Sequence, residues 1–152
     1  MQVRGISIFT YPDHPVCDGG IQMSAKKFGT VINCIDGRVQ IPVNDFLKAA
    51  FGLDYVDTIT EPGPNRLFSN NQDEATIKAA LEKVNISATK HGSKVLGIVG
   101  HFDCAANPVD EPEHIAQIQD ALKTLKSHLG DEMNILGLWV DEHWQAHRVP
   151  EA

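Results

Sequence analysis

The sequence lacks an excess of positive charge, and it lacks long apolar runs. Its 152 residues carry 13 lysines and arginines against 20 aspartates and glutamates, which gives a formal net charge of −7 at pH 7. Nucleic acids and anionic membrane surfaces are attracted to basic patches, so this balance argues against both as partners. No apolar run approaches the roughly 18 residues that a membrane-spanning helix needs. The composition therefore argues against a nucleic-acid-binding protein and excludes a membrane-inserted one.

Cysteine is also scarce. The chain has three cysteines, an odd number that does not fit a framework of disulfides. The N-terminus lacks the basic start followed by an apolar core that marks a signal peptide, so we expect a reducing, cytoplasmic location. The length fits one domain of ordinary size, which can bury a core without disulfides.

The first residues lack hydrophobic periodicity. Prolines and glycines interrupt the pattern at Tyr11–Pro15 and again at Cys17–Gly20, and both clusters are typical of turns. We therefore expect an irregular N-terminal arm over residues 1–23. The folded domain is expected over residues 24–152.

In this domain, strand-like apolar runs alternate with amphipathic helical patterns. Strands are expected at 28–33, 55–60, 95–99 and 135–140. Helices are expected at 45–51, 73–91 and 112–129. Such alternation predicts an α/β fold with a single open parallel sheet (Rossmann-like), four to five strands, and helices on both faces.

Local signals predict how these elements are connected. Asn44 is the expected N-cap of the first helix. Two prolines within 61–65 predict a turn, because proline does not continue a helix or a central strand. A polar loop is expected to follow as far as Asn71. The polar segment 141–149 is expected to add only a short edge strand.

Two stretches, Cys34-Ile-Asp-Gly-Arg38 and His101-Phe-Asp-Cys104, each follow an expected strand. Ligands of open parallel sheets bind beyond the carboxyl ends of the strands. If the two strands are neighbours, Cys34 and His101 lie about one strand spacing apart, roughly 5 Å. Two thiolates and one imidazole suit zinc, and three protein ligands are typical of a catalytic rather than a structural zinc site. The sequence therefore predicts a zinc hydrolase or hydratase.

The pattern Cys34-x-Asp36-x-Arg38, followed by His101-x-x-Cys104 after a second strand, resembles the β-class carbonic anhydrases. The resemblance implies one Zn²⁺ per chain, held by Cys34, His101 and Cys104. It also implies a catalytic dyad of Asp36 and Arg38 that orients or replaces the metal-bound water. The smallest unit implied is a homodimer.

The activity implied is the reversible hydration of carbon dioxide to bicarbonate. Zinc lowers the pKa of its bound water from 15.7 to about 7, which provides hydroxide at neutral pH. Two alternatives stay open. Carbonyl sulfide and carbon disulfide hydrolases are similar to the same family, and this chain has Ala105-Ala106 where the family commonly has glycine after the second cysteine. A non-catalytic zinc or bicarbonate-binding module would result if Asp36 or Cys17 permanently filled the fourth position.

Asp103 and the remaining histidines have less specific surroundings. Asp103 is expected to be a solvated or helix-capping carboxylate rather than a ligand. His143 and His147 are four residues apart, but their segment is expected to be an edge strand, so no second metal site is predicted there. The other histidines are expected at the surface: His14, His91, His114 and His128.

Overall fold

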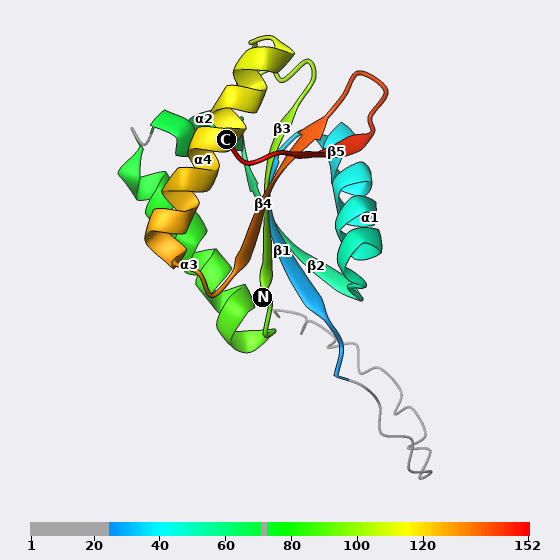
Figure 1. Cartoon of the computed structure of the whole chain (residues 1–152), viewed down its shortest axis with the longest axis vertical. Coiled ribbons are helices and arrows are strands. Elements are labelled where there is room, and N and C mark those ends of the chain that lie inside the picture. Colours follow the sequence, from blue (N-terminus) through cyan, green and yellow to red (C-terminus); the bar gives the residue numbers. More distant parts are fainter. Residues whose placement is uncertain (1–24, 71–72) are drawn as a thin grey trace, which may run out of the picture.

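The computed structural model describes residues 25–70 and 73–152, and these form a central sheet covered by helices on both faces (Figure 1). The predicted N-terminal arm lies outside the described residues, as do Cys17 and His14. None of the helices in the described part of the chain has the length and apolarity that a membrane crossing requires.

The sheet has five strands in the order β2-β1-β3-β4-β5. The strands are β1 (Phe28–Cys34), β2 (Tyr55–Glu61), β3 (Val95–His101), β4 (Asn134–Val140) and β5 (Ala146–Val149). The first four run parallel to their neighbours, and β5 pairs antiparallel with β4 at one edge. The predicted α/β fold is confirmed, including the short edge strand. Strands β1 and β3 are neighbours, which is the condition under which Cys34 and His101 were expected to meet.

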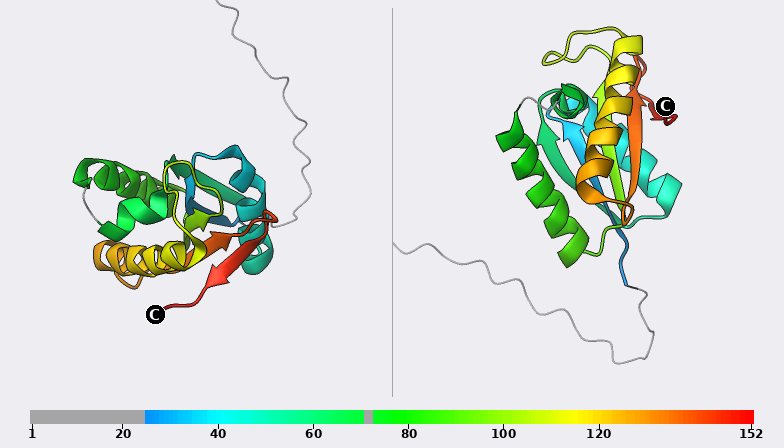
Figure 2. Two further views of the ribbon diagram at one scale, coloured as in Figure 1. Left: turned by 90° about the horizontal axis from the view of Figure 1, so that it is seen from above. Right: turned by 60° about the vertical axis from the view of Figure 1, so that its left-hand side comes forward.

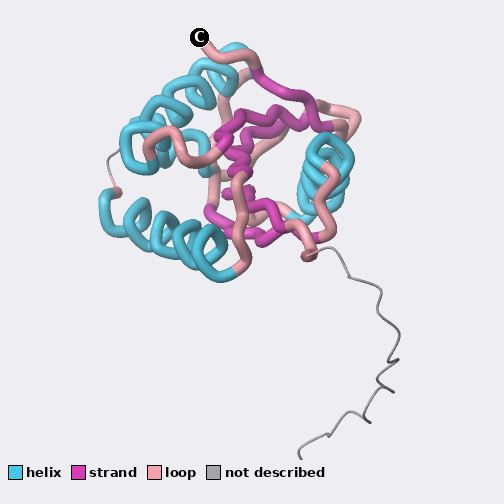
Figure 3. Tube along the Cα trace, turned by 60° about the horizontal axis from the view of Figure 1, so that its bottom comes forward, coloured by secondary structure: helices cyan, strands magenta, loops and turns pink. Residues whose placement is uncertain are grey.

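The helices are divided unequally between the two faces of the sheet. They are α1 (Gln40–Phe51), α2 (Pro64–Asn70), α3 (Glu74–Lys90) and α4 (Glu111–Leu129). Helix α1 covers one face, and the other three cover the opposite face, as the two further views in Figure 2 and the tube in Figure 3 show. Each face has its own apolar core, so the sheet is buried on both sides, as parallel sheets usually are.

Local chemistry explains why the two long helices begin where they do. The carboxylate of Asp73 accepts a hydrogen bond from the backbone N–H of Thr76 (3.0 Å) at the start of α3. Asp110 caps α4 in the same way through Glu113 N (3.1 Å). An aspartate N-cap accepts a hydrogen bond from a backbone N–H that has no partner within the helix. Its negative charge also interacts favourably with the positive end of the helix dipole. Both long helices are confirmed close to their expected bounds.

Two local predictions are wrong. Helix α1 begins at Gln40, several residues before the expected N-cap Asn44, after a short 3-10 turn at Gly37–Val39. The segment expected as a turn and polar loop contains α2, which begins at Pro64. Proline is compatible with the first turn of a helix because the N–H it lacks would have no partner there. The buried side chain of Phe68 anchors this short helix in the core. Seven residues are too few to show a helical hydrophobic period in the sequence.

Candidate metal centre

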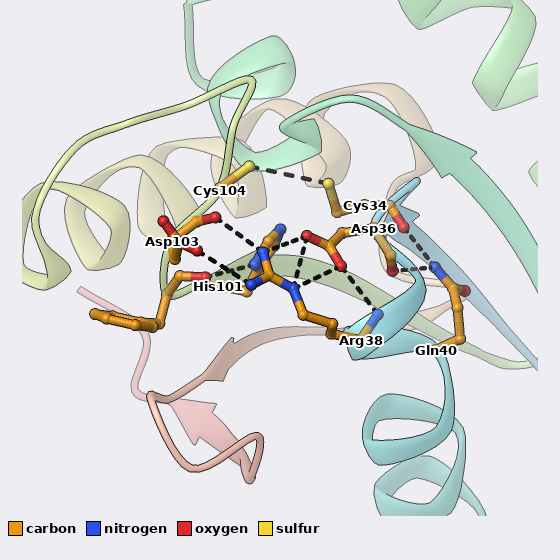
Figure 4. A network of polar contacts seen from close by, with 8 residues as sticks. Cys34, Asp36, Arg38, Gln40, His101, Asp103 and Cys104 are labelled. Atoms are coloured by element: carbon orange, nitrogen blue, oxygen red, sulfur yellow. Dashed lines mark hydrogen bonds and ion pairs between the residues drawn. The ribbon is translucent and has the colours of Figure 1, made fainter.

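The structure brings Cys34, His101 and Cys104 together at the carboxyl end of the sheet. Cys34 is the last residue of β1, His101 is the last residue of β3, and Cys104 lies in the loop that follows. One potential ligand atom from each lies within 4.8 Å of the others, and the two sulfur atoms are 3.9 Å apart (Figure 4). All three side chains are at least 97% buried. Among the described residues, no other group of three or more histidine, cysteine, aspartate or glutamate side chains has this arrangement.

His101 presents one ring nitrogen to the two thiols. Its Nδ1 lies 2.8 Å from the backbone carbonyl of Phe102, so it carries the hydrogen and donates it. The Nε2 atom is therefore the one with a free lone pair, and it is buried without a hydrogen-bond partner. An orphaned buried acceptor is costly unless something binds it. A neutral imidazole nitrogen beside two thiols is the donor set that zinc prefers, so these residues fit the metal.

The two thiols have opposite tendencies to ionise. Hydrogen bonding to Cys104 and to the backbone lowers the pKa of Cys34 well below its usual range, although burial opposes the shift. The proximity of Cys34, together with burial, raises the pKa of Cys104. The pair therefore retains one proton when no cation is bound. A thiophilic divalent cation would replace that proton and stabilise both thiolates.

Asp36 and Arg38 form a hydrogen-bonded ion pair beside the thiols. Arg38 Nη2 lies 2.7 Å from Asp36 Oδ2, and Arg38 Nε lies 3.0 Å from Oδ1. The backbone N–H of Arg38 donates to Oδ1 as well (2.9 Å). These bonds to Arg38 lower the pKa of Asp36 to about 2, so the carboxylate is ionised at neutral pH.

The geometry of the centre agrees with a family comparison. The family described as putative carbonic anhydrase matches residues 24–150. This chain belongs to that family. The predicted relation to the carbonic anhydrases is confirmed, and the match includes all five residues that carried the resemblance. No curated protein matches the chain in sequence.

Solved carbonic anhydrases share the fold of this family member. The enzyme from Glaciozyma antarctica is 16% identical, with 83% of each chain covered and a TM-score of 0.56. The β-carbonic anhydrase of Aspergillus fumigatus is 14% identical, over 84% of this chain and 77% of that one, with a TM-score of 0.52. A tetrameric β-carbonic anhydrase of Sordaria macrospora is 12% identical, over 82% and 81%, with a TM-score of 0.53. At such low identities the similarity establishes the fold alone.

Two residues of this carbonic anhydrase-family centre have contacts that the sequence did not predict. Gln40 donates from Nε2 to the backbone carbonyls of Cys34 (2.7 Å) and Asp36 (2.9 Å), which fixes the turn between them. Asp103 is exposed, as expected, but it does not cap a helix; its carboxylate pairs with Arg38 Nη1 at 3.1 Å. No spacing rule connects these residues, because their contacts depend on how the two loops meet.

The histidines outside the centre have different surroundings. His114 was expected at the surface, but it is completely buried, so that prediction is wrong. Its Nδ1 accepts from the amide groups of Asn65 (2.9 Å) and Asn107 (3.3 Å), which removes the cost of burying that nitrogen. His91 and His128 are exposed, as predicted. His147, on the edge strand, hydrogen-bonds through Nε2 to Asp141 Oδ2 (2.6 Å). Within the described residues it belongs to no metal-binding group.

Proposed function

We propose that this protein catalyses the reversible hydration of carbon dioxide to bicarbonate, with one zinc ion held by Cys34, His101 and Cys104. The observation that carries the proposal is the partnerless Nε2 of His101, buried beside two thiols at the carboxyl end of the sheet. Membership of the carbonic anhydrase family supports the same reaction. Zinc bound there would lower the pKa of water from 15.7 to about 7 and so supply a hydroxide nucleophile at neutral pH.

In the proposed reaction, Asp36 acts as a fixed hydrogen-bond acceptor. Its carboxylate remains ionised because Arg38 holds its pKa at about 2. It therefore accepts a hydrogen bond from the nucleophile and orients the attacking oxygen lone pair towards the carbon. Such a weak base does not store the proton that hydration releases. Water adds one C–O bond to carbon dioxide, bicarbonate leaves, and the proton passes to solvent or buffer.

Backbone groups support the two cysteines in their proposed role as ligands. The N–H groups of Asp36 and Gly63 help to lower the pKa of Cys34, and those of Ala106 and Asn107 partly oppose the rise that Cys34 and burial cause in the pKa of Cys104. Hydrogen bonds of this kind orient metal ligands and moderate the charge on the sulfur atoms.

Stopped-flow measurement of carbon dioxide hydration by the zinc-loaded protein, from pH 6 to 9, tests the proposal. We expect catalysed hydration that Asp36→Asn reduces and that His143→Ala leaves unchanged, because His143 is 74% exposed and lies outside the centre. Hydration no faster than buffer at every pH would contradict the proposal. Release of sulfide from carbonyl sulfide or carbon disulfide would then identify the alternative substrates. Tight zinc binding without any of these activities would indicate a non-catalytic module.

We further propose that the functional unit is a homodimer. Large apolar side chains are exposed in the segments that follow β1 and β3, next to the centre, as Ile35 (65% exposed) and Phe102 (45%) show. A second copy covering this edge would bury apolar surface and enclose the site. The related β-carbonic anhydrases of Sordaria macrospora are tetrameric.

A further inference from the structure

Two residues of the described chain other than glycine have a positive φ angle, Asp103 (φ 53°) and Trp144 (φ 59°). Left-handed backbone is unfavourable for residues with a side chain and persists where surrounding contacts impose it, often at functional sites. Asp103 lies in the loop after β3, and Trp144 lies in the turn between β4 and β5. Both contact the same guanidinium, that of Arg38.

Asp103 binds the guanidinium with two of its oxygen atoms. Arg38 Nη1 donates to the carboxylate Oδ2, and Nη2 donates to the backbone carbonyl, each at 3.1 Å. Figure 4 shows both oxygens directed at Arg38, on the side away from Asp36. The left-handed backbone conformation of Asp103 allows both contacts. Its energetic cost is offset by the two charge-assisted hydrogen bonds to Arg38.

Trp144 covers the flat face of the same group. The Arg38 Cζ atom lies 4.4 Å from the centroid of the Trp144 ring, within cation–π range. Asp141 fixes the turn that presents this ring: its Oδ1 accepts from the backbone N–H groups of His143 and Gln145, both at 2.9 Å. The backbone N–H of Trp144 donates to the Asp141 carbonyl (3.0 Å). The hydrogen bonds of the hairpin turn therefore fix the position of the Trp144 backbone, from which the ring extends over Arg38.

These contacts matter because the Arg38 side chain is 44% exposed. An isolated exposed ion pair contributes little, since holding two flexible side chains in one geometry costs conformational entropy. Arg38 is instead bound along one edge by Asp36, along another by Asp103, and on its face by Trp144. Planar guanidinium is suited to simultaneous bidentate and stacking contacts.

We propose that Trp144 and Asp103 are positioning residues that hold the Arg38 guanidinium against Asp36. Through Arg38, the β4–β5 hairpin thereby controls the orientation of the Asp36 carboxylate, which lies in the segment after β1. The consequence for catalysis rests on the proposed function, but the positioning itself can be measured without any activity. Glycine would suit the backbone of this turn better, but it would lack the ring that holds Arg38.

Hydrogen exchange of the Arg38 Nε–H, followed by ¹⁵N NMR on the zinc-loaded protein, tests the positioning directly. We expect Trp144→Leu to accelerate exchange about threefold, the size that loss of one exposed cation–π contact implies. Trp144→Phe keeps an aromatic face and should restore most of the protection. Arg66, which donates to the Ala106 carbonyl (3.2 Å), is the internal reference, and its exchange should not change.

Two further variants separate positioning from general loosening. Asp103→Gly accepts φ 53° without strain and removes only an exposed carboxylate, so it should fold normally and accelerate Arg38 exchange. His143→Ala, in the same turn as Trp144, removes an exposed side chain that does not contact Arg38 and should leave exchange unchanged. Wild-type exchange in both Trp144→Leu and Asp103→Gly would overturn the inference. An equal acceleration in His143→Ala would also overturn it.

Hydration kinetics then connect positioning to the reaction. We expect Trp144→Leu to lower kcat/KM about threefold at unchanged zinc content, with Trp144→Phe close to wild type. Unchanged kcat/KM despite faster Arg38 exchange would overturn the role in catalysis. If the wild-type protein hydrates no carbon dioxide, the proposed function fails, whereas the exchange measurements still decide whether Trp144 and Asp103 position Arg38.

Discussion

At the scale of single residues, the two ring nitrogens of His101 are in different surroundings, and this difference shapes the centre. The Phe102 carbonyl holds the hydrogen on Nδ1, which leaves Nε2 as the nitrogen that faces the thiols. A histidine whose tautomer is fixed in this way is ready to bind a metal before the metal arrives. The same contact also fixes the orientation of the ring, so Nε2 and the two sulfur atoms converge on one point.

Loss of any one of the three proposed ligands should abolish zinc binding. We expect one zinc per chain in the wild-type protein and almost none in Cys34→Ser, His101→Ala or Cys104→Ser, because two remaining ligands form an inadequate site. Atomic absorption measures the zinc content, and X-ray absorption should show two sulfur ligands and one nitrogen. His147→Ala is the matched control and should keep its zinc. Four sulfur and nitrogen ligands in the wild type would contradict the prediction, because they would indicate a closed structural site.

Removal of the Arg38 guanidinium should change the ionisation of Asp36. The pKa of Asp36 is about 2 because Arg38 hydrogen-bonds its carboxylate, and in zinc-free Arg38→Ala it should rise towards 3.8. A lowered carboxylate pKa contributes stability above pH 3.8 that is lost as the pH falls towards 2. Arg38→Ala should therefore lose this acid-sensitive contribution. In a ¹³C NMR titration of the zinc-free proteins from pH 7 to 3, the Asp36 carboxyl should titrate in Arg38→Ala and stay ionised in the wild type.

The same variant should lose hydration activity, because the freed Asp36 carboxylate can turn towards the proposed metal. We expect a loss of tenfold or more, on the order of what misoriented groups cost. A crystal structure of zinc-loaded Arg38→Ala decides the cause. Asp36 at about 2.0 to 2.2 Å from zinc supports the displacement. Asp36 beyond that distance, with a water still bound to zinc, would mean that Arg38 has another role.

Sequence patterns predicted the residues at strand ends but not the residues that surround them. Cys34 and His101 each end a recognisable apolar run, so the general rule for parallel sheets places them together. Trp144 gives no such signal, because its contact with Arg38 depends on the turn that Asp141 organises. Contacts between loops of this kind depend on three-dimensional geometry that spacing along the chain does not encode.

At the scale of the elements, a buried polar network joins α2 to α4. Asn65 of α2 donates to His114 and to Gln117 of α4 at 2.9 and 3.0 Å. Asn107, from the loop that carries Cys104, donates to Gln117 at 2.7 Å. The network ties the loop of a proposed metal ligand to two helices. Sequence analysis missed it because α2 was assigned to a loop and His114 to the surface, and a short helix with few apolar residues gives little periodic signal.

The buried His114 should make the protein less stable in acid. Burial, and secondly the nearby His101, lowers the pKa of His114 below 6.5, and its Nδ1 already accepts two hydrogen bonds. In the unfolded chain, His114 therefore binds a proton more readily than in the folded protein. The stability that neutral His114 contributes is complete above pH 6.5 and is lost as the pH falls below it. We expect this group to lower the free energy of unfolding as the pH falls from 6.5 to 5, by no more than the roughly 1.4 kcal/mol per pH unit that one proton contributes.

Urea unfolding at pH 7 and pH 5 measures the effect. His114→Gln keeps a hydrogen-bond acceptor but does not titrate, so its stability should depend less on pH than that of the wild type, although it should be lower at pH 7. His128→Gln, at an exposed position on the same helix, should keep the wild-type pH dependence. An unchanged pH dependence in His114→Gln would show that His114 titrates normally.

At the scale of the whole molecule, the order of the strands creates the centre. Because β1 and β3 are adjacent, the residues at their carboxyl ends converge, although Cys34 and His101 are far apart along the chain. The alternation of strands and helices predicted a parallel sheet with its site at the carboxyl ends, whereas the adjacency of β1 and β3 was only assumed. The assembly of several chains is different, because it depends on surfaces rather than on buried patterns. It therefore requires a separate test.

The exposed apolar residues near the centre make a dimer testable by mutation. Ile41, in the first turn of α1, is 72% exposed, and Ile35, directly after Cys34, is 65% exposed. We expect sedimentation velocity at micromolar concentration to give twice the mass of one chain, and Ile41→Lys to shift the protein towards monomer, because a buried unpaired charge is costly. Ile86→Lys is the control: Ile86 is 57% exposed on α3, on the opposite face of the sheet, and should remain dimeric. A wild-type monomer with full hydration activity would contradict both the dimer and its proposed part in enclosing the site.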